Sequence, residues 1–98
     1  MPSIYCETTK QFSWTRQLGE ILQMCVNRLC VGEIRYGTPD PTQDYVARAE
    51  RALARYRRNG NKEQLLDAAN YCILEYRAPL HPDAHLEITD SEGRNKKI

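Results

Sequence analysis

The stretch "RRNGNKEQLLDAANYCILEYRAP" (residues 57–79) decides the fold, because it holds the end of one helix and the whole of the next. Its two arginines followed by Gly60 are typical of a helix end, where cations favour the helix dipole and glycine adopts the left-handed conformation. Asn61 and Gln64 have the spacing of a capping box, and Pro79 ends the second helix. Because only Gly60 and Asn61 separate the two helices, the sequence predicts an antiparallel helix hairpin.

Upstream, apolar residues recur at the spacings of three and four that are typical of amphipathic helices. Ser13 is a good N-cap for a first helix, which ends at Gly32 or continues to Gly37. Its apolar stripe consists of Trp14, Leu18, Ile21, Leu22, Cys25, Val26 and Leu29. Asp40 followed by Pro41 predicts the start of a second helix. The apolar stripe of that helix consists of Tyr45, Ala49, Ala52, Leu53 and Tyr56.

The helix that follows Asn61 carries two different faces. Its predicted inner face consists of Leu65, Leu66, Ala69, Cys72, Ile73 and Tyr76. Asp67, Asn70 and Tyr71 lie on a second face, which indicates contact with a partner chain as well as contact within the domain. We therefore predict a single all-α, three-helix domain in which the first helix packs on the antiparallel hairpin. The domain covers residues 1–98, with an irregular arm (1–12), a helical core (13–79) and a turn with a flexible tail (80–98).

The size and charge of the chain limit its class. A chain of 98 residues buries only about 60–65% of the surface that its unfolded form exposes, so we expect self-association into a homo-oligomer. No apolar run is long enough to span a membrane and the N-terminus lacks a secretory signal, which predicts a cytoplasmic protein without membrane contact. The net charge of +1 provides no overall field that attracts nucleic acid, so any electrostatic site is local.

Two cysteines and two histidines have spacings that resemble a zinc site: Cys25 and Cys30, and His81 and His85. Residues five apart on a helix point about 140° away from each other, so the two thiols diverge. Both histidines belong to the turn "HPDAH" and are predicted to make local hydrogen bonds. We therefore predict no metal ligands, with a structural zinc protein as a weaker alternative.

Asp67 and Asn70 also allow a catalytic interpretation. The stretch "LLDAANYCIL" resembles the last helix of MazG-like all-α nucleotide pyrophosphohydrolases. In that family a Glu-x-x-Glu pair and a Glu-x-x-Asp pair hold the metal, so the resemblance implies a Mg²⁺-dependent hydrolase or a nucleotide-binding protein. The chain lacks Glu-x-x-Glu and carries the amide of Asn70 where a carboxylate is needed. The enzyme is therefore the alternative, and the leading interpretation is a polar seam without catalytic residues or cofactor, in which Asp67 and Asn70 hydrogen-bond across the helix hairpin or to a partner chain.

A line of arginines runs along the second helix: Arg48, Arg51, Arg55 and Arg58. Arginine binds phosphate and carboxylate groups through paired hydrogen bonds, so a nucleic-acid backbone, a nucleotide or an acidic protein surface would fit. The alternative is a solvated face that is paired with the neighbouring carboxylates Asp44, Glu50 and Glu63.

Residues 45–93 resemble a group of small helical proteins that are encoded by bacteria and their phages and have no established activity. The likeness rests on "RRNGN", "LLDAANY", "LEY", "HPDAH" and "ITDSEG". It implies mobile-element ancestry. Together with the arginine line, it predicts a non-enzymatic binding or regulatory protein that acts on a host protein or a nucleic-acid machine. Tyr45 and Tyr71 are predicted to contribute to this contact, because tyrosine is common at interfaces.

Overall fold

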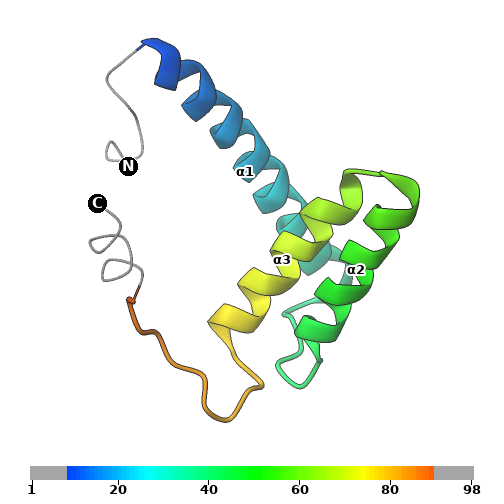
Figure 1. Ribbon diagram of the computed structural model, residues 1–98. Helices are drawn as coiled ribbons and strands as arrows, with labels where there is room; N and C mark the ends of the chain where they lie inside the picture. The colour runs from blue at the N-terminus through cyan, green and yellow to red at the C-terminus, as the bar shows by residue number, and fades with distance from the viewer. Residues whose placement is uncertain (1–8, 90–98) are drawn as a thin grey trace.

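Three helices make up the part of the chain that the computed structural model describes, residues 9–89, with side chains from Trp14 onward. They are α1 (Thr9–Tyr36), α2 (Tyr45–Asn59) and α3 (Glu63–Arg77), and no strand lies in this range. Figure 1 shows α2 and α3 side by side, while α1 crosses α3 near its own C-terminal end. The predicted all-α, three-helix fold is confirmed.

The first helix is longer than predicted at its start, and it ends at the later of its two predicted ends. It begins at Thr9 instead of after Ser13, so the last four residues of the predicted arm are helical. It passes through Gly32 and ends before Gly37, whose φ of 83° is left-handed and whose N–H donates to the Glu33 carbonyl at 2.8 Å. Residues 1–8 of the predicted arm and 90–98 of the predicted flexible tail lie outside the described residues.

The predicted start of α2 at Asp40 and Pro41 is wrong by four residues. The Asp40 carboxylate accepts hydrogen bonds from the Thr42 backbone N–H at 2.9 Å and from the Thr42 hydroxyl at 2.7 Å. These bonds lower the pKa of Asp40 below its usual value and hold the residue in a turn. Asp44 is the N-cap instead, because its carboxylate accepts from the Ala47 N–H at 2.9 Å.

The predicted hairpin is confirmed, although three residues (60–62) separate α2 from α3 instead of the predicted two. Gly60 has a φ of 69°, and its N–H donates to the Tyr56 carbonyl at 2.7 Å. This is the left-handed helix end that the sequence predicts. At the far end of α3, Ala78 already has extended backbone angles (φ −141°, ψ 79°) before Pro79, as expected for a residue that precedes proline.

The predicted capping box of α3 is wrong. The Asn61 side chain accepts a hydrogen bond from the Glu63 N–H at 3.0 Å, which satisfies one free donor of the first turn. The Gln64 side chain does not return to Asn61. Its carbonyl oxygen accepts instead from Arg55 Nε at 3.0 Å, so Gln64 ties α3 to α2.

Small side chains dominate the interior. The buried hydrophobic residues are Cys25, Tyr45, Ala49, Ala52 and Ala68. The alanines let the backbones of α2 and α3 approach closely, and the Tyr45 and Tyr71 rings stack beside them at 6.0 Å with an interplanar angle of 17°. No large side chain among the described residues is completely buried. The interior of the single chain is therefore thin.

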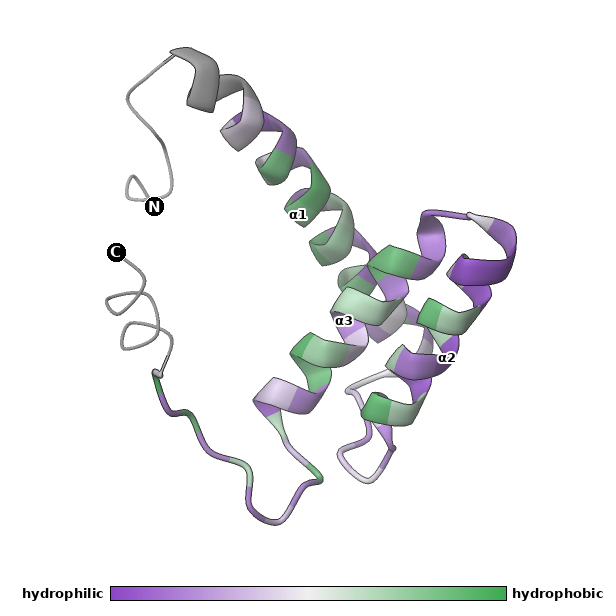
Figure 2. Ribbon diagram, viewed as in Figure 1, coloured by the Kyte–Doolittle hydropathy of each residue, from purple (hydrophilic) through white to green (hydrophobic). Residues whose placement is uncertain are grey.

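The orientation of α3 differs from the prediction. Five of the six residues of its predicted inner face are exposed: Leu65, Ala69, Cys72, Ile73 and Tyr76. The buried residues are Ala68 and Asn70, on the sides toward the other two helices. The apolar spacing identified a real apolar face of α3, but this face is not the buried one. The side that carries Ala68 and Asn70 is buried instead, because its small and polar side chains let α1 and α2 approach closely. Figure 2 shows the apolar residues that remain along the outer side of α3.

No helix in the described range is long and apolar enough to cross a membrane.

Gly60→Ala tests the turn. Alanine in the left-handed conformation costs about 1 kcal/mol or more, so we expect the free energy of unfolding to fall by that amount. Urea denaturation followed by circular dichroism measures it. The control is Gly19→Ala within α1, where an added Cβ meets nothing within 4 Å. We expect the control to be neutral or to stabilise by up to about 1 kcal/mol. Equal losses in both variants would contradict the assignment of the turn.

Candidate functional site

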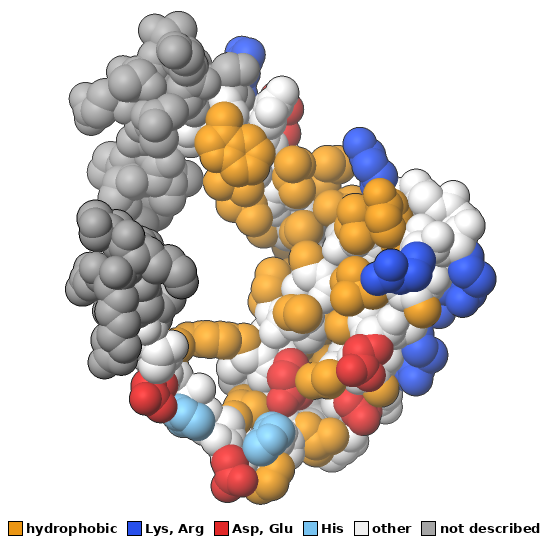
Figure 3. All heavy atoms as spheres, viewed as in Figure 1, with side chains coloured by type: hydrophobic (Ala, Val, Ile, Leu, Met, Phe, Trp, Pro, Cys, Tyr) orange, Lys and Arg blue, Asp and Glu red, His pale blue; other side chains and the backbone are white. Residues whose placement is uncertain are grey.

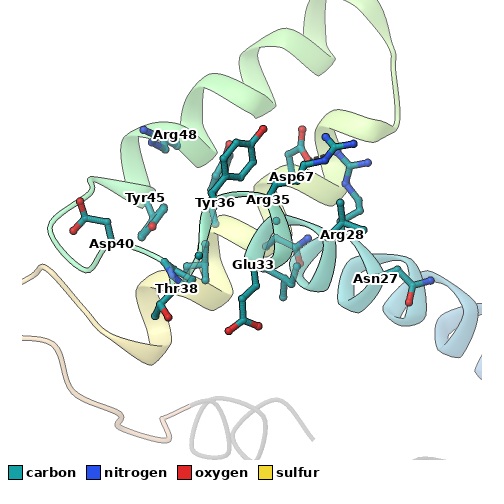
Figure 4. A pocket seen from close by; sticks show the side chains of 18 of the residues that line it. Asn27, Arg28, Glu33, Arg35, Tyr36, Thr38, Asp40, Tyr45, Arg48 and Asp67 are labelled. Atoms are coloured by element: carbon teal, nitrogen blue, oxygen red, sulfur yellow. Dashed lines mark hydrogen bonds and ion pairs between the residues drawn. The ribbon is translucent and has the colours of Figure 1, made fainter.

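A charged cluster joins α1 to α3. Arg28 of α1 places Nη2 at 3.0 Å from Glu63 Oε2 and at 2.7 Å from Asp67 Oδ1, both on α3 (Figure 4). The hydrogen bond to Asp67 raises the pKa of the Arg28 guanidinium above its usual value and outweighs the opposite effect of burial. One permanent cation therefore serves two carboxylates that lie four residues apart on the same side of α3.

Arg28 is a site residue that the sequence prediction missed. The available signal was a cation inside the apolar run of α1, between Val26 and Leu29. A second signal was the spacing of Glu63 and Asp67, which places two carboxylates on one side of α3. Neither signal says that the groups meet, because the pairing joins residues 35 and 39 positions apart.

Asn70 also joins α3 to α1, through a buried hydrogen bond. Its side chain is buried, and Nδ2 donates a hydrogen bond to the Cys25 carbonyl of α1 at 3.1 Å. Asp67 and Asn70 thus form a polar seam with α1 of the same chain, whereas the sequence predicted bonds across the helix hairpin or to a partner chain. Both residues hold the two helices together.

A cleft of about 780 Å³ opens beside this cluster, between the C-terminal part of α1, the loop that follows it, and the adjoining parts of α2 and α3. Figure 4 shows Arg28, Asp67, Tyr45 and Arg48 around it. Two buried atoms of residues that line the cleft, Arg28 Nε and Asn70 Oδ1, have no hydrogen-bond partner among the described residues.

The arrangement at Asp67 and Asn70 does not suit a magnesium ion as it stands. A divalent cation needs several oxygen ligands with negative charge. Here the Arg28 guanidinium already neutralises Glu63 and Asp67, and Asn70 turns its amide nitrogen toward Cys25. Within residues 14–89, no group of three His, Cys, Asp or Glu side chains is placed to hold a metal ion. Arg28 would have to leave before a cation could bind.

The two histidines take part in local hydrogen bonds. His81 Nδ1 accepts from the Asp83 N–H at 2.9 Å, and His85 Nδ1 lies 2.9 Å from the Asp83 carbonyl. His85 Nε2 lies 3.4 Å from a Glu87 carboxylate oxygen. The predicted local role of both residues is confirmed. The Glu75 carboxylate accepts N–H groups at the start of this turn and fixes its exit from α3.

The predicted line of arginines lies on one side of α2 and has no carboxylate partner among the described residues. Arg48 donates to the Gln43 side chain at 2.6 Å, and Arg55 donates to Gln64 at 3.0 Å. Arg51 and Arg58 are exposed. The alternative interpretation expected pairing with acidic neighbours, one of which, Glu63, is bound to Arg28 instead.

The two predicted contact tyrosines lie inside the molecule. Tyr45 is only 7% exposed, and Tyr71 is half-buried against the alanines that pack α2 against α3. Their stacked rings form one wall of the cleft. They support the helices from within, so a partner on the outer surface would meet the arginines and not these rings.

Asn70→Ala removes the buried hydrogen bond to α1. We expect the free energy of unfolding to fall by about 1 kcal/mol, because an intramolecular hydrogen bond contributes about that much. The control is Asn27→Ala, at an exposed position of α1, which we expect to change stability by less than about 0.5 kcal/mol. Both variants are measured by urea denaturation. Loss of stability only in the control would contradict the role of Asn70.

Comparisons with known proteins do not assign a family: no family model, no curated protein and no solved structure matches the chain. The resemblances to nucleotide pyrophosphohydrolases and to small phage-encoded proteins therefore stay predictions. What the chain does has to be argued from the contacts, charges and exposure of its own described residues.

Proposed function

We propose that this protein is a non-enzymatic binding or regulatory protein that contacts an acidic partner through the arginine face of α2, which consists of Arg48, Arg51, Arg55 and Arg58. One observation carries the proposal: four arginines share a side of one helix, and no carboxylate neutralises them within residues 14–89. Phosphate or carboxylate groups on a partner would supply the missing charge. The resemblance to proteins of bacteria and their phages supports a host protein or a nucleic-acid machine as the target.

The geometry of this face suits an extended partner. The four side chains follow one another over about 15 Å of helix, which matches several phosphates or acidic side chains in a row. By helix geometry, Glu50 and Arg57 lie about 80–180° around α2 from the four arginines, so Glu50 borders the face without standing inside it. Two of the arginines are held by glutamine side chains, which leaves their charge available and restricts their orientation.

A nucleotide hydrolase or nucleotide-binding protein remains the second candidate function. The cleft favours it, because Arg48, Asp67 and Tyr45 line a space of about 780 Å³. The ion pairs of Arg28 argue against the hydrolase, since they occupy the carboxylates that would hold magnesium.

Reversing charge on the arginine face tests the leading proposal. The variant is Arg51→Glu with Arg58→Glu, at exposed positions. The probes are a fluorescent DNA duplex and fluorescent polyglutamate, followed by anisotropy at physiological salt, where fields are screened beyond about 8 Å. We expect the wild type to bind at least one probe and the variant to bind it at least ten-fold more weakly.

The matched control makes the same charge change away from this face, with Arg57→Glu and Arg77→Glu. We expect its affinity to stay within about two-fold of the wild type, because these positions lie outside the predicted contact. A wild type that binds neither probe would contradict the proposal. An equal loss in the control would show attraction by overall charge and no defined face.

Hydrolysis assays test the second candidate. We expect the purified protein to release neither phosphate nor pyrophosphate from nucleoside triphosphates with Mg²⁺, because Arg28 neutralises the carboxylates of α3. The assay includes Asp67→Ala and, as a control, Asp83→Ala in the exposed turn. Magnesium-dependent activity that Asp67→Ala abolishes and Asp83→Ala retains would reverse the ranking of the two functions.

A further inference from the structure

The N-terminal half of α1 extends beyond the rest of the structure. Its apolar stripe continues in line with Cys25, which is buried where α1 meets α3. Before Cys25 the large apolar side chains of this stripe are open to different degrees: Trp14 is 57% exposed, Ile21 41% and Leu22 48%, whereas Leu18 is half-buried and the neighbouring Thr15 is buried. Three large apolar side chains of the N-terminal half, Trp14, Ile21 and Leu22, therefore keep about half of their surface exposed.

The outer side of α3 presents a second uncovered stripe next to the first. Leu65, Ala69, Cys72 and Tyr76 follow one another at spacings of four, three and four, with Ile73 beside them. This is the spacing with which helices pack along a common seam, and every one of these residues is exposed. Figure 3 shows hydrophobic side chains gathered along α1 and the adjoining side of α3.

We define the open apolar face as the residues of these two stripes: Trp14, Leu18, Ile21 and Leu22 of α1 with Leu65, Ala69, Ile73 and Tyr76 of α3. A large apolar side chain that is about half exposed leaves on the order of 100 Å² in water, so the whole face reaches on the order of 600 Å². A stable interface buries about 800 Å² on each partner. The face is thus close to the size that a dimer needs and larger than a monomer ordinarily leaves open.

The charge pattern of the face suits a second copy of the same chain. Between residues 11 and 27, α1 carries only Arg16 and Glu20 as charged residues. Both positions point about opposite the apolar stripe, by the geometry of a helix. The stripe of α3 contains no charged residue. Because a face without charge meets no like-charge repulsion when it pairs with itself, self-association carries no electrostatic penalty here.

We propose that two copies of this protein form a dimer in which each open apolar face covers the other. Because α3 packs against α1 at Cys25 and Arg28, we place the second helix along the N-terminal half. Two α1 helices satisfy this condition together when they run antiparallel about Leu18. Trp14 then lies across from the partner's Leu22. Such a contact is isologous and closes after two copies.

Sedimentation equilibrium tests the proposal on the full-length chain. We expect the wild type to sediment at twice its chain mass of 11.4 kDa at micromolar concentrations. Leu22→Glu in α1 and Ile73→Glu in α3 each place a charge in the face, and we expect each to raise the dissociation constant at least ten-fold. Both positions are half-exposed, so the helices stay folded, and circular dichroism checks this.

Matched controls place the same charge on exposed apolar residues outside the face. Ile34→Glu lies on the far side of α1 at 84% exposure, and Val46→Glu lies on α2 at 50% exposure. We expect both controls to remain dimers. Trp14 is the sole tryptophan, so its emission gives a second readout that shifts to longer wavelength on dilution of the wild type and in Leu22→Glu.

A wild type that is monomeric at about 200 µM would overturn the proposal and leave another segment or protein to cover the face. A dimer that survives both Leu22→Glu and Ile73→Glu would overturn it too, as would a dimer that Ile34→Glu dissociates equally well. The arginine face lies on α2, outside the open apolar face, so charge reversal at Arg51 and Arg58 leaves the dimer intact. Failure of one proposal is therefore distinct from failure of the other.

Discussion

The guanidinium of Arg28, held between Glu63 and Asp67, is the contact on which the arrangement of the helices depends. The hairpin of α2 and α3 is held by an extended apolar contact, whereas α1 meets α3 over a short length. No large side chain is fully buried at that crossing within the described residues. Polar bonds with defined directions, from Arg28 and Asn70, therefore set the place and angle at which α1 lies.

This crossing accounts for the two surfaces that the proposals use. Because α1 is fixed near its C-terminal end, Trp14, Ile21 and Leu22 of its N-terminal half and the outer side of α3 stay about half exposed or more open. On the other side of the crossing, the loop after α1 leads to α2 and leaves the cleft beneath Arg48. The arginine face of α2 lies apart from the apolar surface and borders the cleft through Arg48. The polar contact between α1 and α3 thus leaves the open apolar face and the arginine face as two separate surfaces.

Features that depend on neighbouring residues could be predicted from the sequence. Gly60 and Ala78 adopt the backbone angles that glycine after a helix and a residue before proline prefer, so two helix ends were correct. The start of α2 was wrong because Asp40 and Asp44 are equally good N-caps by residue type. What decides between them is Thr42, which binds the first carboxylate in a turn.

Features that depend on contact between helices could not be predicted in the same way. Residue spacing showed that Asp67 and Asn70 share one side of a helix and that the four arginines share one side of another. Within a helix, the spacing alone determines the angle between side chains. It could not pair α3 with Arg28 of α1. It could not show either that Ala68 and Asn70 would be covered while Ile73 stayed exposed. Apolar spacing identifies a face that is expected to be buried. On α3 this apolar face is exposed in the single chain, and it is the face that the proposed dimer covers.

The three-residue connection from Gly60 to Lys62 has a consequence for how the chain reaches this structure. Contacts between α2 and α3 join residues close in sequence, so the hairpin closes a short loop and forms early. The bonds of Arg28 and Asn70 join residues 35 to 45 positions apart and require that hairpin as their template. The order of assembly is therefore hairpin first and α1 last. Local opening reverses this order, so amide hydrogens in α1 exchange with solvent before those of the hairpin.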